Sequence, residues 1–250
     1  MIVLGIETAG PRGSVALLRD DAEPLEVTFP ATGRLGAEMT PAIRRLLKQA
    51  GLKGDQVPDL VAVDTGPGSY TGLRIGIAAA KGLAFAWSRP LVGVTVVEAL
   101  SAEALAVVAR AAAGERARAV AAQAPFERIL CALDASRGEV YAASYARSEN
   151  RVSPEGAGAL VDSALLAATI QPRTFVVGDA APGFADSGRG IVAADPDLAW
   201  PTATRIARIG RRMQLEGYRQ DALGLAPTYY RPNEAEEQRR KRARASSRGA

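Results

Sequence analysis

The sequence predicts an α/β protein built from two duplicated lobes, each a mixed sheet with flanking helices. The first observation is an alternation of short apolar strands with amphipathic helical patterns along most of the chain. The second is that one pattern, a strand, an acidic residue, a glycine turn and a returning strand, occurs at 2–20 and again at 129–146. The chain has 250 residues and is 48% hydrophobic, which suits one globular unit or two lobes with separate cores.

The first half of the chain predicts a hairpin, a third strand and then alternating helices and strands. A buried strand at 2–8 pairs across the turn AGPRG with a strand at 13–20, and PLEVTFPA follows as a third strand. The segments LVAVDTG and LVGVTV are further buried strands. Amphipathic or apolar helical patterns cover 37–50, 71–87 and 98–113.

The second half repeats these elements in the same order. Asp134 corresponds to Glu7, Gly138 to Gly13 and Val140 to Val15 when a two-residue gap is allowed in the turn. Further on, FVVGDAAPGF resembles VAVDTGPGSY, since both are apolar strands that open into a turn with glycine and proline. We interpret the recurrence as an internal duplication, and two ordinary hairpins that resemble each other by chance are the alternative.

The domain organisation follows from these elements. We expect a first lobe over 1–105, a second over 106–200, and a helix at 203–217 that packs back on the first lobe. The prolines of APTYYRP, at 226–232, favour an extended segment. Residues 233–250 contain six Lys or Arg and three acids without core-forming side chains, which predicts a disordered basic tail.

Composition excludes several classes of function. The chain contains no histidine, so a Ser-His-Asp hydrolase is excluded, and with Cys131 as the single cysteine a zinc site or an internal disulfide is not expected. We therefore assign no catalytic residue and no metal site. The net charge of +4 comes mostly from the tail, so the folded part is not a basic nucleic-acid-binding domain. No apolar run is long enough to cross a membrane, and we expect a cytoplasmic protein.

A glycine-rich stretch, DTGPGSYTGLRIG at 64–76, joins a predicted strand to a predicted helix. Such a turn can expose backbone amides at a helix start, where an anion binds. It lacks the Gly-Lys-Ser/Thr ending of a P-loop, so a turn without a ligand is the alternative. If the stretch does contact a nucleotide, the candidate residues are Gly66, Gly68, Ser69, Tyr70 and Arg74.

Small residues recur at four-residue steps along the helix that follows, at Gly72, Gly76, Ala80 and Ala84. Glycine inside a helix costs about 1 kcal/mol relative to alanine, so close approach of another element is expected. That element is either another part of this chain or a helix of a partner. For the second case, the candidate interface is Met39, Ile43, Leu46, Leu47, Gly72, Leu73, Gly76, Ile77, Ala80 and Lys81.

Two lobes that each begin with a strand, an acid and a glycine hairpin resemble the actin-like ATPase (ASKHA) fold, whose hairpins bind phosphates. The stretch GPGSYTGLRIGIAAAKGLA at 66–84 resembles the signature of the TsaB (YeaZ) family more closely. LDASRGEVYAASY and the closing PTYYRPNEAE also fit that family, and the resemblance covers about residues 1–235.

The resemblance implies a noncatalytic partner of the transferase TsaD. With the ATPase TsaE, that pair places a threonylcarbamoyl group on the adenosine next to the anticodon of tRNA. It implies a TsaD heterodimer through the helices at 37–50 and 71–87, no required cofactor, no membrane contact and an indirect relation to tRNA. ATP or ADP at the partner interface and a homodimer through the same surface are left open, and an actin-like small-molecule kinase or ATPase is the alternative function.

This sequence departs from the family pattern at two places. The first hairpin acid is Glu7 where aspartate is common, and Gly36 and Ala37 replace the His-Ser of a His-Ser-Glu stretch that ends here in Glu38. Glu7 and Asp134 could hold Mg²⁺ in principle, but one acid per lobe makes a poor site without bound phosphates. We therefore expect both acids to act in turn and hydrogen-bond chemistry.

Overall fold

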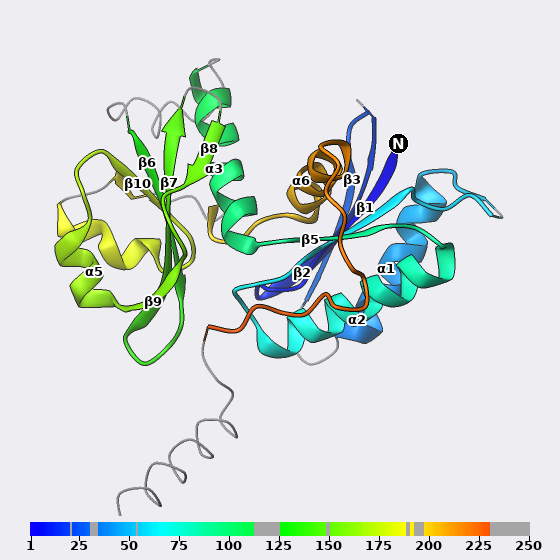
Figure 1. The fold of residues 1–250 in the computed structure, drawn as a ribbon, viewed down its shortest axis with the longest axis horizontal. Coiled ribbons are helices and arrows are strands. Elements are labelled where there is room, and N and C mark those ends of the chain that lie inside the picture. Colours follow the sequence, from blue (N-terminus) through cyan, green and yellow to red (C-terminus); the bar gives the residue numbers. More distant parts are fainter. Residues whose placement is uncertain are drawn as a thin grey trace, which may run out of the picture.

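The computed structural model describes residues 1–20, 22–30, 35–53, 55–112, 126–148, 151–188, 191–192 and 198–230, and these form two lobes, each around its own sheet (Figure 1). The predicted disordered tail at 233–250 lies outside the described residues. Within the described part of the chain, no helix is both long enough and apolar enough to span a membrane.

The first lobe contains a five-stranded mixed sheet in the order β3-β2-β1-β4-β5. Its first three strands form antiparallel hairpins, whereas β4 is parallel to β1 and β5 is parallel to β4. Short turns allow the antiparallel pairing of the first three strands, and longer connections that contain a helix bring β4 and β5 into parallel positions. The strands are β1 (Ile2–Glu7), β2 (Arg12–Arg19), β3 (Leu25–Pro30), β4 (Leu60–Asp64) and β5 (Leu91–Val94).

The second lobe repeats this topology, which confirms the predicted duplication. Its sheet has the order β11-β10-β6-β7-β8, with β9 also paired to β7; β6 is antiparallel to β7 and parallel to β10. The strands are β6 (Arg128–Asp134), β7 (Glu139–Ser148), β8 (Arg151–Pro154), β9 (Ala159–Asp162), β10 (Thr174–Val177) and β11 (Ile191–Val192).

The hairpin registers correct one detail of the sequence comparison. Glu7 pairs with Ser14 in the first lobe, and Asp134 pairs with Val140 in the second. Val140 therefore corresponds to Ser14 and not to Val15, because the turn of the second lobe is one residue shorter than that of the first.

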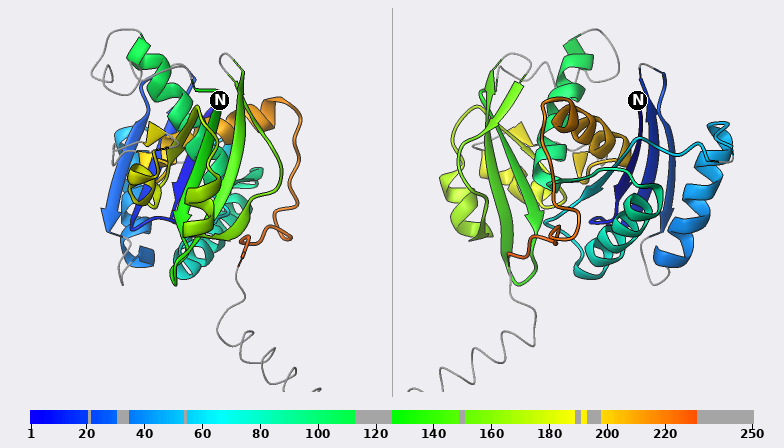
Figure 2. Two further views of the ribbon diagram at one scale, coloured as in Figure 1. Left: turned by 90° about the vertical axis from the view of Figure 1, so that its left-hand side faces the viewer. Right: turned by 45° about the vertical axis from the view of Figure 1, so that its right-hand side comes forward.

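Helices cover both faces of the first sheet (Figures 1 and 2). On one face lie α1 (Leu35–Gln49) and α2 (Tyr70–Trp87), and α3 (Val96–Ala112) and α6 (Ala203–Leu215) share the core on the other. In the second lobe, α5 (Ser163–Thr169) and the 3₁₀ helix η1 (Ala181–Ser187) pack on the face directed away from the first lobe.

The two lobes share one hydrophobic cluster rather than meeting only at a hinge. Side chains of α3 pack against β6, β7 and β10 of the second lobe, and the same cluster includes Ala9 and Leu73 from the first lobe. Val96, Leu100 and Ile129 within it are fully buried. This shared core fixes the lobes side by side and sets the width of the space between them.

The helix α6 anchors the C-terminal part of the chain to the first sheet. The Ala203 amide donates to Ser14 Oγ at 2.9 Å and to Glu26 Oε1 at 3.1 Å, and the Thr204 hydroxyl donates to Glu26 Oε2 at 2.6 Å. Strand β1 comes so close that a side chain at Gly5 would clash with the Ala203 carbonyl oxygen. The helix thus completes the core of the lobe that the first residues of the chain begin.

The helix α2 is pressed against the turn that follows β1. A β-carbon at Gly72 would clash with the carbonyl oxygen of Thr8, and one at Gly76 would clash with the Thr8 hydroxyl. The small residues on this face of α2 therefore accommodate the chain's own hairpin. On the opposite face, a β-carbon at Gly82 would have no atom of the described part of the chain within 4 Å.

These two glycines predict opposite effects of the same substitution. Gly72→Ala should lower the free energy of unfolding by about 1–3 kcal/mol, because the backbone carbonyl of Thr8 cannot move away without disturbing the sheet. Gly82→Ala should raise it by up to about 1 kcal/mol, because alanine favours the helix and its methyl group would meet none of the residues that the structure describes. Urea unfolding of both variants measures these changes, and equal effects at the two positions would contradict the packing described here.

Candidate functional site: the cleft between the lobes

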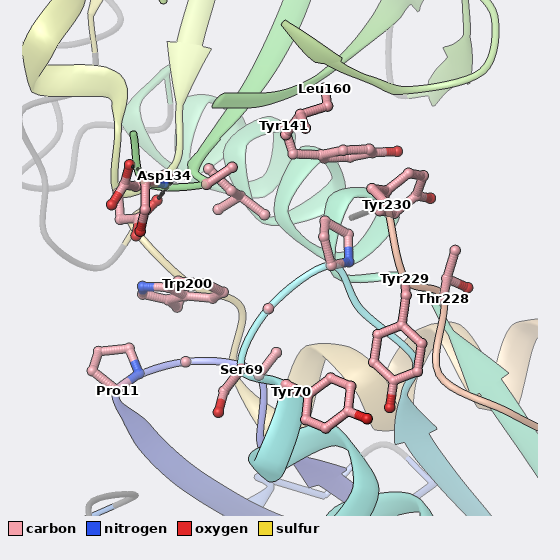
Figure 3. A pocket seen from close by; sticks show the side chains of 18 of the residues that line it. Pro11, Ser69, Tyr70, Asp134, Tyr141, Leu160, Trp200, Thr228, Tyr229 and Tyr230 are labelled. Atoms are coloured by element: carbon pink, nitrogen blue, oxygen red, sulfur yellow. Dashed lines mark hydrogen bonds between the residues drawn. The ribbon is translucent and has the colours of Figure 1, made fainter. Parts of the chain in front are cut away.

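A cleft of about 950 Å³ lies between the lobes, where the turns of both duplicated units meet (Figure 3). The first lobe contributes the β1–β2 turn, with Gly10 and Pro11, and the glycine loop, with Gly68 and Ser69. The second lobe contributes the β6–β7 turn at 134–137 and Asp179 after β10. The C-terminal segment 228–230 closes one side.

The second-lobe wall of the cleft is acidic. Asp179 Oδ1 accepts a hydrogen bond from the Asp134 amide at 2.8 Å, and Asp134 Oδ1 accepts one from the Ser136 amide at 2.9 Å. Burial raises the pKa of Asp179, and the neighbouring Asp134 carboxylate raises it further. Arg137 is the one cation among the described residues that line the cleft, and it already interacts within the chain.

Two further carboxyl groups, Glu7 and Asp64, lie buried at the ends of adjacent parallel strands of the first lobe. Glu7 Oε1 accepts from the amides of Ala9 and Gly10 at 2.8 and 2.9 Å, so its carboxylate organises the hairpin turn. Asp64 Oδ1 accepts from the Thr8 hydroxyl at 3.1 Å, whereas Asp64 Oδ2 has no partner among the described residues.

This environment disfavours ionisation of both groups. Burial raises the pKa of Asp64 to about 7. Burial, and then the nearby Asp64 carboxyl, raise the pKa of Glu7 well above its usual range. The pair therefore carries less negative charge at neutral pH than two exposed carboxylates would.

Aromatic side chains line the remainder of the cleft (Figure 3). The indole of Trp200 packs over Gly10, where a β-carbon would lie 3.0 Å from the ring. The rings of Tyr141 and Tyr230 lie 4.0 Å apart between centroids, and those of Tyr70 and Tyr229 lie 4.8 Å apart. Successive tyrosines of the C-terminal segment thus contact different lobes.

The predicted nucleotide loop reaches the cleft, but its residues have different roles there. Gly68, Ser69 and Tyr70 line the cleft, whereas Gly66 lies behind it against Leu73. Arg74 donates from Nε to the Tyr229 hydroxyl at 2.8 Å and lies over the Tyr70 ring, so it secures the C-terminal segment. Contact with a nucleotide stays a prediction.

The predicted interface residues lie mainly inside the first lobe. Leu47 and Lys81 are half-buried, and Lys81 Nζ donates to the Leu223 carbonyl oxygen at 2.7 Å. The other eight are buried within this chain and are therefore not available to a partner, contrary to the prediction. They are Met39, Ile43, Leu46, Gly72, Leu73, Gly76, Ile77 and Ala80. The spacing identified the small-residue face of α2, but periodicity does not show whether such a face packs on the same chain or on a partner.

The outward face of α2 is instead formed by Thr71, Arg74, Ala78, Gly82 and Phe85. These residues follow one another at three- and four-residue steps, so they share one side of the helix. Phe85 is 87% exposed. The outer face of α2 thus combines an open glycine with a large apolar side chain in solvent.

Several residues of the cleft were not predicted from the sequence: Asp179, Trp200, Thr228, Tyr229 and Tyr230. Of these, only Asp179 could have been predicted from the sequence. It closely follows a buried parallel strand, just as Asp64 stands at the end of one. Trp200 and the tyrosines lie in segments without periodicity. Among the described residues, no group of three or more Asp, Glu or Cys side chains is placed to hold a metal ion.

Two duplicated mixed sheets whose hairpin turns face each other across a cleft define an actin-like ATPase fold. A family model described as TsaD, tRNA N6-adenosine threonylcarbamoyltransferase, matches residues 34–170. The chain belongs to this family, in its TsaB (YeaZ) branch.

Three comparisons show how far the similarity extends. TsaB of Escherichia coli K12 is 29% identical over 242 residues, which cover 94% of this chain and 96% of that protein. YeaZ from Pseudomonas aeruginosa has a solved structure with a TM-score of 0.69 and 25% identity, covering 91% of this chain and 99% of that one. A threonylcarbamoyltransferase of Thermomicrobium roseum is 34% identical, over 39% of this chain and 31% of that enzyme.

The buried acids predict a pH-dependent stability. Because the folded-state pKa of Asp64 lies above its unfolded value, folding retains a proton, and the free energy of unfolding should fall as the pH rises from about 4 to 7. Asp64→Asn should make the decline of the free energy of unfolding with pH less steep. Part of the decline should remain, because the pKa of Glu7 is also raised in the folded state. Urea unfolding at several pH values measures how the free energy of unfolding depends on pH. The control is Asp55→Asn, which changes an exposed carboxylate. The same slope in wild type and Asp64→Asn would contradict the assignment.

Proposed function

We propose that this chain is a noncatalytic subunit of the machinery that makes threonylcarbamoyladenosine in tRNA, and that it binds a TsaD-type transferase. Membership of the family and the full-length similarity to TsaB of Escherichia coli support the pathway. The observation that carries the binding role is the outer face of α2. The chain has no histidine for acid–base chemistry at neutral pH, which favours a supporting role over catalysis.

The outer face of α2 has features that the chain itself does not explain. Gly82 weakens the helix by about 1 kcal/mol relative to alanine, yet none of the described residues has an atom within 4 Å of where its β-carbon would be. Ala78 and Ala86, four residues away on either side, are exposed and also small. Phe85 leaves 87% of its side chain in water. A partner helix that packs closely over Gly82 and covers Phe85 would account for all three features.

The neighbouring helix α1 extends this surface. It lies beside α2 on the same face of the sheet, and a β-carbon at Gly36 would lie 3.7 Å from the side chain of Ile75 (Figure 1). Its exposed side chains include three cations, Arg44, Arg45 and Lys48. We propose that α2 provides the apolar centre of the contact and α1 a polar rim, as interfaces commonly have. In this proposal the chain needs no cofactor, and TsaE joins the larger assembly.

Substitutions on the outer face should separate partner binding from folding. Phe85→Glu and Gly82→Leu should abolish co-elution with TsaD and lower threonylcarbamoylation of tRNA by at least about tenfold, because a charge or a bulky side chain prevents close packing. Phe85 is exposed and a β-carbon at Gly82 would lie in open space, so the thermal unfolding midpoint should change little. The matched control is Leu165→Glu, which changes a residue on α5 of the second lobe that is 58% exposed.

The experiment reconstitutes the reaction from TsaD, TsaE, the synthase of the activated donor and this chain, with gel filtration of each mixture. Full activity without this chain, and no co-elution, would rule out the proposed role. Normal binding by Phe85→Glu and Gly82→Leu would rule out the surface but not the role. ATP turnover by the chain alone would favour the alternative, an actin-like kinase or ATPase.

A further inference from the structure

The cleft between the lobes has no part in the proposed contact, yet its walls are built for a ligand. Five aromatic side chains line it, and three of them, Tyr70, Tyr229 and Tyr230, are 36–41% exposed. Trp200 lies between Asp134 and Pro11, on the side of the space opposite Tyr229 and Tyr230 (Figure 3). Exposed aromatic surface that is gathered in a concave place is typical of a binding site.

The places where phosphate groups would lie in an actin-like cleft are unsuited to them. The Ser69 amide already donates to the Ala9 carbonyl oxygen at 2.9 Å, and the Gly72 amide donates to Ser69 Oγ at 3.1 Å. Arg74 is held by Tyr229. On the opposite wall, the Asp134 and Asp179 carboxyl groups would repel a phosphate, and Arg137 is already engaged.

We propose that the cleft binds a nucleobase, presented as a nucleoside or as an unpaired base of RNA, and discriminates against nucleotide phosphates. A planar base can stack on Trp200 and on the tyrosine rings. The carboxylate oxygens of Asp134 and Asp179 can accept hydrogen bonds from its amino groups. This goes beyond the proposed function, because nucleoside binding by the isolated chain does not depend on the TsaD contact.

The C-terminal segment completes the site. The Thr228 amide donates to the Thr65 carbonyl oxygen at 2.8 Å, which sets Tyr229 and Tyr230 in an extended stretch at the mouth of the cleft. Tyr229 rests on the first lobe and Tyr230 on the second. The site therefore needs both lobes and the end of the chain together, and a fragment that lacks 226–230 would have an open wall.

The test is isothermal titration calorimetry of the full chain with adenosine, AMP and Mg²⁺-ATP. Adenosine should bind most tightly and Mg²⁺-ATP at least about tenfold more weakly, because each added phosphate faces the two carboxyl groups. Trp200→Ala should weaken adenosine binding by about tenfold or more, since it removes a stacking surface. Tyr218→Ala, which changes an exposed tyrosine outside the cleft, should leave it unchanged.

Two further arms keep the test decisive. Asp134→Asn changes an exposed carboxylate and should reduce the difference between the dissociation constants of adenosine and Mg²⁺-ATP. This arm remains informative if Trp200→Ala disturbs folding. An RNA stem-loop with one unpaired adenosine, compared with the same RNA carrying an abasic residue, distinguishes a base in RNA from a free nucleoside. Base-dependent binding of either ligand supports the site. Tighter binding of Mg²⁺-ATP than of adenosine, or no base-dependent binding in any arm, would overturn it.

Discussion

The contact between Thr8 and the two glycines of α2 determines much of the remaining structure. It holds the first helix turn against the β1–β2 hairpin so closely that only glycine fits at Gly72 and Gly76. The same approach brings the Ser69 amide to the Ala9 carbonyl oxygen. Hairpin and glycine loop thereby become one rigid floor of the cleft. The contact thus adds to the shared core between the lobes and to the packing of α2 through Ile77, Ala80 and Ala84 on the first sheet.

One consequence is that α2 serves three regions at once. Its inner face holds the hairpin, its first turn borders the cleft through Tyr70, and its outer face is open to a partner around Gly82 and Phe85. Arg74 connects the last two regions, because it lies on the outer face and bonds to Tyr229 at the cleft. A partner seated on α2 would therefore touch the side chain that holds the C-terminal segment in place.

Local patterns made much of the fold predictable. The hairpins, the duplication and the helices at 37–50 and 71–87 all have short-range signals, and the structure has them within a few residues. The neighbour of the small-residue stripe could not be read from the sequence, because Thr8 lies 64 residues before Gly72 in the chain. The aromatic lining of the cleft could not be predicted either, because Trp200 and Tyr230 come from irregular segments that only the tertiary fold brings together.

The place of α6 in the first lobe also bears on how the chain is made. Ile206, Ala207 and Ile209 complete the core over β1 and β4, although the whole second lobe separates them in the sequence. During synthesis, the second lobe has all its strands before the first lobe receives its last helix. The face of the first sheet that α3 and α6 share therefore lacks α6 on the ribosome until translation has passed residue 215 and the helix has left the exit tunnel.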